Sequence, residues 1–160
     1  ALGDEGAVIL SGILRTRGKA PELKVEAARV LGEMASNKGI DALSEALNAR
    51  NVQVQLAALD ALKKLGVQKA LPRITALTNA TDEKVRNAAY ETLYELGGSN
   101  AFSIFVSRLM EEENPELKIK LMEYIDELKG ADAVYYFREL LDDNNENIVA
   151  KAKEFIKKYV

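Results

Sequence analysis

The sequence predicts an all-α protein, a right-handed α-solenoid of about five two-helix repeats, from the spacing and pattern of its apolar residues. Five apolar residues recur at steps of 31, 31, 32 and 31 residues: Leu23, Val54, Val85, Leu117 and Ile148. The positions 4, 8 and 11 residues after each of them are apolar or aromatic as well. These offsets fall on one stripe of an α-helix, because each residue turns by about 100°. A fixed period of this length is typical of solenoids, in which each unit is one supersecondary element.

A shorter helix is predicted before each of these longer helices, so that every unit has a first and a second helix. The first helices are predicted over residues 4–17, 39–49, 70–80, 101–111 and 133–143. A single domain, residues 1–160, is thereby divided into repeats over about 4–38, 39–69, 70–100, 101–132 and 133–160.

Residues at the expected helix ends agree with this division. Asn51, and either Thr81 or Asp82, precede second helices, where a side-chain oxygen accepts hydrogen bonds from free N–H groups of the first turn. Gly66 and Gly97 follow second helices and fit the left-handed residue that ends many helices.

The first helix, residues 4–17, has apolar residues around more of its circumference than one buried stripe requires. Val8, Ile9 and Leu10 follow one another directly. A terminal helix of a repeat array is expected to present a polar outer face. Two interpretations follow: a neighbouring segment before residue 1 covers this helix, or single exposed apolar residues are tolerated here.

The pattern D-x-x-V-R-x-x-A over residues 82–89, followed by Leu93 and Gly97, resembles the second helix of a HEAT repeat. The subtype is the short one also seen in phycobilin-lyase-type proteins, and the resemblance covers residues 39–160 closely and 4–38 more loosely. In that family the Asp and Arg of the motif often form a ladder between repeats. Only Asp82 and Arg86 keep both here, so a continuous ladder is not expected. The resemblance implies that the second helices line a concave surface.

Composition limits the chemistry that the chain can perform. It contains no Cys and no His, which removes the usual zinc ligands, cysteine nucleophiles and histidine acid–base catalysis. We therefore expect no metal, cofactor or catalytic residue. The net charge is −3, without the basic surface typical of nucleic-acid binding. The longest apolar run, residues 7–14, is too short to span a bilayer, so a soluble protein is expected, with the cytoplasm as the default compartment.

A candidate binding surface lies on the face of the second helices opposite the core. With the core at offsets 0, 4, 8 and 11, the positions at offsets 2 and 6 lie opposite it, flanked by offsets 3 and 10. The candidate protein-binding residues are Leu56, Asp60, Asn87, Glu91, Tyr94, Glu95, Ile119, Glu123 and Glu127. Acids beside exposed apolar residues suit a basic or amphipathic protein segment. We therefore predict a non-catalytic scaffold for protein–protein interaction.

Other interpretations of these residues remain open. The acids are equally compatible with a simply solvated helix face, and Tyr90 and Tyr94 with packing between repeats. HEAT-like solenoids include phycobilin lyases and DNA glycosylases, so an enzyme of either type is an alternative function. In that case paired acids such as Glu91 and Glu95 would transfer protons. A structural segment of a longer solenoid is the third possibility.

Overall fold

The structure, a computed structural model, describes residues 2–160, so residue 1 of the predicted domain lies outside it. Within this range the regular elements are α-helices and short 3-10 helices, with no strand. The chain divides into two compact units, Ala1–Gly97 and Gly98–Val160. The predicted all-α class is confirmed.

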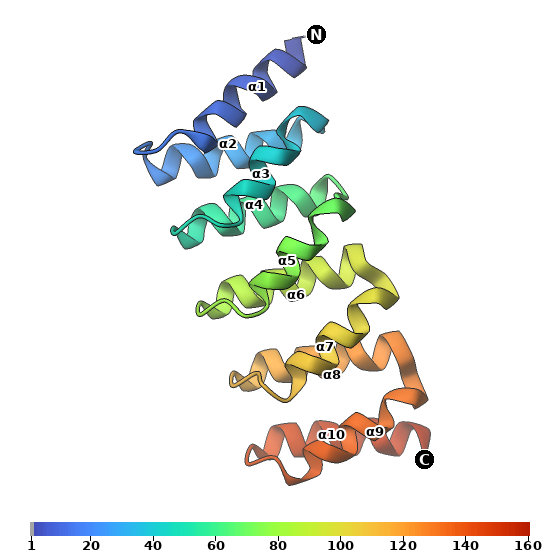
Figure 1. Ribbon diagram of the computed structural model, residues 1–160. Helices are drawn as coiled ribbons and strands as arrows, with labels where there is room; N and C mark the ends of the chain where they lie inside the picture. Colours follow the sequence, from blue (N-terminus) through green and yellow to red (C-terminus); the bar gives the residue numbers. More distant parts are fainter. Residues whose placement is uncertain (1) are drawn as a thin grey trace. The chain divides into compact units, whose positions relative to one another are not determined.

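The first unit contains three pairs of helices, each a first helix followed by a second. Its elements are α1 (Leu2–Arg15), α2 (Pro21–Glu33), η1 (Asn37–Gly39), α3 (Ile40–Ala46), α4 (Val52–Lys64), η2 (Gln68–Ala70), α5 (Leu71–Leu77) and α6 (Glu83–Gly97). The second helices α2, α4 and α6 pack against one another in chain order, and α1 packs against both α2 and α3. Figure 1 shows the shorter helices α3 and α5 in front of the longer α4 and α6.

The second unit repeats this arrangement with two pairs. Its elements are η3 (Gly98–Ala101), α7 (Phe102–Leu109), α8 (Pro115–Lys129), η4 (Gly130–Ala133), α9 (Val134–Glu139), η5 (Leu140–Asp142) and α10 (Glu146–Tyr159). The first helices α7 and α9 pack on their own second helices, and α8 packs against α10. All five predicted helix pairs are therefore present.

The predicted apolar stripe forms the core of both units. In α4 it buries Val54, Ala58 and Leu62, and the equivalent residues of α6 are buried as well. Leu23 is an exception, since its exposed fraction is 43 %. It lies in the first turn of α2, beside a loop whose residues 16–20 are all exposed, so it is only partly covered.

The second helices α4 and α6 begin at predicted caps. The side chain of Asn51 accepts a hydrogen bond from the backbone N–H of Val54, at 3.2 Å. Of the two candidates before α6, Asp82 is the cap, and its Oδ1 accepts from the N–H of Lys84 at 2.9 Å and of Val85 at 3.2 Å. These side chains satisfy N–H groups that have no partner within the helix.

The helix ends follow the prediction at one glycine and differ from it at another. Gly66 adopts a left-handed φ of 64° after α4. Gly97 does not, because α6 continues through it, and the left-handed residue is Gly98, with a φ of 51°. After α2 the left-handed position is taken by Ala35, with a φ of 50°. An alanine is strained there because its Cβ crowds the backbone in this conformation.

The close approach of α2 and α4 depends on a glycine. A Cβ added to Gly32 would lie 2.9 Å from the Cα and 3.0 Å from the Cβ of Ala61. Real carbon atoms in contact are about 3.5–4.0 Å apart. Two small residues therefore let the second helices of the first two repeats come together.

The first helix is only partly buried. Ala7 and Leu14 of α1 belong to the core, whereas the exposed fractions of Val8 and Ile9 are 60 % and 67 %. The apolar surface noted in the sequence is therefore real. It lies on the side of α1 turned away from its contacts with α2 and α3.

Candidate functional site

Six of the nine predicted binding residues lie on neighbouring second helices of the first unit. Leu56 and Asp60 are on α4, and Asn87, Glu91, Tyr94 and Glu95 are on α6. Because α4 packs directly against α6, the same relative positions of two successive repeats come side by side. Five of the six side chains are half-buried and Glu95 is exposed, so this surface of α4 and α6 is partly accessible. We call these six residues the α4–α6 face.

Lysines neutralise part of the acidic charge of the α4–α6 face. The ammonium of Lys64 lies 2.7 Å from Asp60, one turn away on the same helix. The ammonium of Lys63 reaches from α4 to Glu95 on α6, at 3.5 Å. The side-chain amide of Asn87 donates to Glu91 at 3.3 Å. The face therefore carries a mixed pattern of charges instead of a row of acids alone.

The remaining three predicted residues, Ile119, Glu123 and Glu127, lie on α8 in the second unit. Ile119 is half-buried and the two glutamates are exposed. Lys151 of α10 lies 3.6 Å from Glu123, and its ammonium stands 4.8 Å from the centre of the Phe155 ring. A lysine of the next helix thus faces an acid here too.

An ion pair between successive second helices recurs in the two units with its polarity reversed. Lys63 of α4 pairs with Glu95 of α6, and Asp126 of α8 pairs with Lys158 of α10, at 2.7 Å. Both pairs join the ninth position after the repeat anchor in one helix to the tenth position in the next. The Asp126 hydrogen bond raises the pKa of Lys158 above its usual value.

Sequence reasoning missed these lysines, although a signal for them exists. In two of the four steps from one repeat to the next, opposite charges stand at the ninth position of one repeat and the tenth of the following one, which only a comparison between repeats reveals. Asp126 is also unexpectedly buried, with an exposed fraction of 6 %, and its Oδ1 has no hydrogen-bond partner among residues 2–160. The ion pair with Lys158 therefore satisfies only one of its two oxygens.

The two tyrosines of α6 take different positions. Tyr90 is fully buried, and its hydroxyl donates to the carbonyl of Thr78 at 3.5 Å. This agrees with the packing interpretation of Tyr90. Tyr94 is half-buried and keeps part of its ring accessible, so it remains a candidate for binding.

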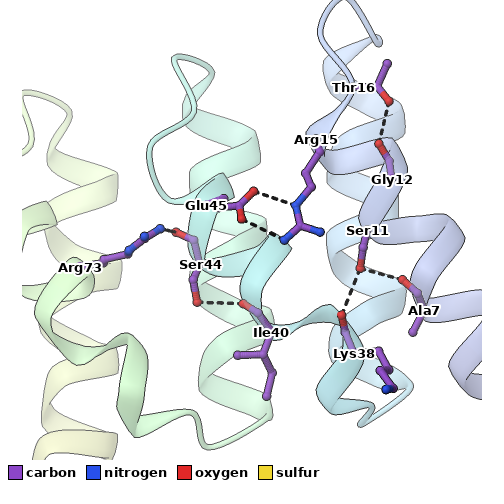
Figure 2. A network of polar contacts seen from close by, with 10 residues as sticks. All are labelled: Ala7, Ser11, Gly12, Arg15, Thr16, Lys38, Ile40, Ser44, Glu45 and Arg73. Carbon is purple, nitrogen blue, oxygen red and sulfur yellow. Dashed lines mark hydrogen bonds and ion pairs between the residues drawn. The ribbon is translucent and has the colours of Figure 1, made fainter.

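A second polar site, which sequence reasoning did not find, lies on the first helices of the first unit. It is a shallow pocket of about 310 Å³ lined by Arg15, Asp41, Ser44, Glu45, Lys69 and Arg73. We call it the first-helix pocket. Figure 2 shows Arg15 of α1 and Arg73 of α5 reaching α3 from opposite sides.

Ion pairs between different helices hold the walls of the first-helix pocket. Arg15 binds Glu45 with two hydrogen bonds, from Nε at 2.8 Å and from Nη2 at 2.9 Å. Lys69 binds Asp41 at 2.9 Å, and Nη1 of Arg73 donates to the carbonyl of Ser44 at 3.0 Å. The Arg15 hydrogen bonds lower the pKa of Glu45, and the Lys69 hydrogen bond lowers that of Asp41. Both acids are therefore ionised at neutral pH.

The described residues contain no group of three or more metal-ligating side chains placed to hold an ion. None of the helices within residues 2–160 is both long enough and apolar enough to cross a membrane.

Comparisons with known proteins identify the repeat and several similar folds. The family model for HEAT repeats matches residues 9–94 and 40–117. The complex of CpcE and CpcF of phycocyanin lyase from Nostoc sp. PCC7120 is similar over 96% of this chain, with a TM-score of 0.67 and 20% sequence identity. This chain spans 65% of the length of that one, which is less than two thirds.

Two engineered proteins are also similar. The crystal structure of an engineered protein matches 97% of this chain and 79% of its own, with a TM-score of 0.57 and 17% identity. A designed armadillo repeat protein in complex with the peptide (KR)4 matches 96% of this chain and 81% of its own, with a TM-score of 0.53 and 18% identity. At these identities the likeness concerns the fold alone. No curated protein matches the chain.

Proposed function

The chain belongs to the HEAT-repeat family, and from this premise we propose that it is a non-catalytic scaffold that binds a basic or amphipathic protein segment on its second helices. One observation carries the proposal: the direct packing of α4 against α6, which brings corresponding positions of successive repeats into register. A surface preformed in this way needs little ordering on binding, so little conformational entropy is lost.

The chemistry of the α4–α6 face supports this class of partner. Leu56 and Tyr94 offer partly accessible apolar surface next to Asp60, Glu91 and Glu95. Apolar contacts of this kind supply binding energy, whereas the acids select a cationic partner and speed its approach. The engineered relative in complex with (KR)4 provides a precedent, in a similar fold, for a basic peptide as ligand.

The ion pair between Lys63 and Glu95 predicts how each of these two residues affects the binding of a basic peptide. Lys63 lies between the two helices and partly neutralises Glu95. An incoming cationic side chain competes with Lys63 for this carboxylate. The two members of the pair should therefore affect binding of a basic peptide in opposite directions.

A titration with the synthetic peptide (KR)4, followed by fluorescence anisotropy at low salt, tests the proposal. Glu91→Gln/Glu95→Gln should weaken binding about 2- to 30-fold, from about 0.2–1 kcal/mol for each exposed charge contact. Lys63→Gln should instead strengthen it, because Glu95 becomes available. The control Glu5→Gln/Glu113→Gln removes the same charge from exposed positions outside the face and should behave as wild type.

The outcomes separate a local site from a general charge effect. If both double variants weaken binding equally, net charge alone attracts the peptide and the proposal fails. If Lys63→Gln weakens binding, Lys63 does not compete with the peptide for Glu95, and the proposed role of this ion pair fails. Raising the salt concentration should weaken wild-type binding, because screening acts most strongly on exposed charges.

The residues Ile119, Glu123 and Glu127 form a corresponding proposed surface on α8 in the second unit. Here Lys151 takes the place of Lys63 as the competing cation for a glutamate. Lys151→Gln and Glu123→Gln should therefore shift peptide affinity in opposite directions, as proposed for the α4–α6 face.

A further inference from the structure

The first-helix pocket has an excess of positive charge that its own residues do not balance. Two acids and three cations line it. Glu45 is bound by Arg15 through two hydrogen bonds, and Asp41 is bound by Lys69. Arg73 makes no ion pair among residues 2–160, although its charge helps to lower the pKa of Asp41 and Glu45 after the larger effects of Lys69 and Arg15. The five charges therefore leave the pocket with one net positive charge.

Arg73 is held in place by a contact that leaves most of its donors available. Its Nη1 donates to the backbone carbonyl of Ser44 on the neighbouring helix, at 3.0 Å. A neutral carbonyl orients the guanidinium without neutralising it. The other guanidinium nitrogens, Nε and Nη2, have no hydrogen-bond partner within the part of the chain that the structure describes. This planar group presents paired donors that match two oxygens of a carboxylate or phosphate.

Lys69 adds a second cation on the same side of the pocket. It precedes Arg73 by four residues, at the start of the same 3-10 and α-helical segment. Its ammonium has three donors, and Asp41 takes one of them. An anion bound by Arg73 would therefore lie near a second positive charge.

We propose that the first-helix pocket binds an oxyanion, a carboxylate or phosphate group, through Arg73 with Lys69 beside it. The site lies on α1, α3, η2 and α5, whereas the α4–α6 face belongs to the second helices. The ligand also has the opposite charge to the basic segment proposed for that face. The inference is therefore independent of the proposed function.

Two probes test the proposal and distinguish the possible sources of the oxyanion. Inorganic phosphate and a capped hexaglutamate peptide are each titrated into the ¹⁵N-labelled chain. The Nε–H signal of Arg73 and the backbone amide signals of Lys69 and Ser44 are followed by NMR. Saturable shifts of these signals with either probe support the oxyanion site, and the more tightly bound probe identifies the preferred group. Absence of saturable shifts with both probes would overturn it.

Variants with folded spectra show whether the charge acts locally. Arg73→Gln should weaken binding about tenfold or more, since hydrogen bonds to charged groups are worth about 1.5–3 kcal/mol. Arg50→Gln removes an exposed arginine outside the pocket and should leave the affinity unchanged. Glu45→Gln should strengthen binding, because it frees the guanidinium of Arg15. Equal weakening by Arg73→Gln and Arg50→Gln, or weaker binding in Glu45→Gln, would contradict the assignment.

Discussion

Replacement of Gly32 by alanine tests the close packing of the second helices. Gly32 lies in α2, where the added Cβ would stand 2.9 Å from the Cα of Ala61 on α4. This is about 0.6 Å shorter than an ordinary contact between carbon atoms. A methyl group forced into a packed interface costs about 1–3 kcal/mol. Alanine also favours the helix over glycine by about 0.5–1 kcal/mol. The net expected change is therefore a destabilisation of up to about 2.5 kcal/mol.

Gly12→Ala provides a matched control in the same unit. Gly12 lies in α1, and a Cβ added there meets nothing within 4 Å. This variant should be stabilised by the helix-propensity gain alone. The propensity gain is common to both variants, so the difference in their unfolding free energies isolates the overpacking term, about 1–3 kcal/mol. Urea unfolding followed by circular dichroism measures this difference. Equal stabilisation of both variants would show that α2 and α4 separate easily and would refute the close-packing argument.

Three further predictions concern the core, a helix end and an ion pair. Leu93→Ala should lower the unfolding free energy by about 2–5 kcal/mol, because Leu93 is fully buried; a near-neutral urea midpoint would contradict the assigned helix register. Ala35→Gly should raise the thermal midpoint, since glycine relieves about 1–2 kcal/mol of left-handed strain; a lowered midpoint would show that Ala35 is not strained. Burial raises the pKa of Asp143, but hydrogen bonds from Asn145 and Lys118 outweigh it and lower the pKa overall. The lowered pKa stabilises the fold above about pH 4, the unfolded value, and this contribution is lost as the pH falls through the folded pKa. Asp143→Asn should therefore be less stable than wild type at pH 7, with the difference shrinking at lower pH; a constant difference down to pH 2 would contradict this.

The period of the sequence was enough to predict the helix pairs and most of the core. Val54, Ala58 and Leu62 are buried as the stripe requires, because one helix face determines which residues meet the neighbouring helices. The cap at Asn51 followed from local chemistry, which also limited the cap of α6 to Thr81 or Asp82. Such signals depend only on residues a few positions apart, and the same signals recur in several repeats.

The structure differs from the sequence-based prediction where burial or a helix end depends on contacts outside the helix concerned. Leu23 has an apolar position in the stripe but lies beside an exposed loop. At the end of α6 two glycines follow each other, and either residue could have ended the helix. The second one, Gly98, adopts the left-handed conformation. Neither result can be read from the apolar pattern.

The partners of the charged side chains in the candidate sites were the least predictable feature. The sequence places acids on the face opposite the core, but not the lysine that reaches Glu95 from the preceding helix. Likewise, the apolar pattern does not show that Arg15, at the end of the first helix, binds Glu45 on α3. Long side chains have many rotamers, so their partners depend on the spacing between helices.

A map of the peptide on the chain tests the central claim most directly. We would titrate (KR)4 into the ¹⁵N-labelled protein and follow the backbone amide signals by NMR. The proposed function predicts the largest saturable shifts on α4 and α6, around Asp60, Glu91 and Glu95, with smaller shifts around Ser44 and Arg73 in the first-helix pocket. Largest shifts in that pocket, or no saturable shift on the second helices, would contradict it.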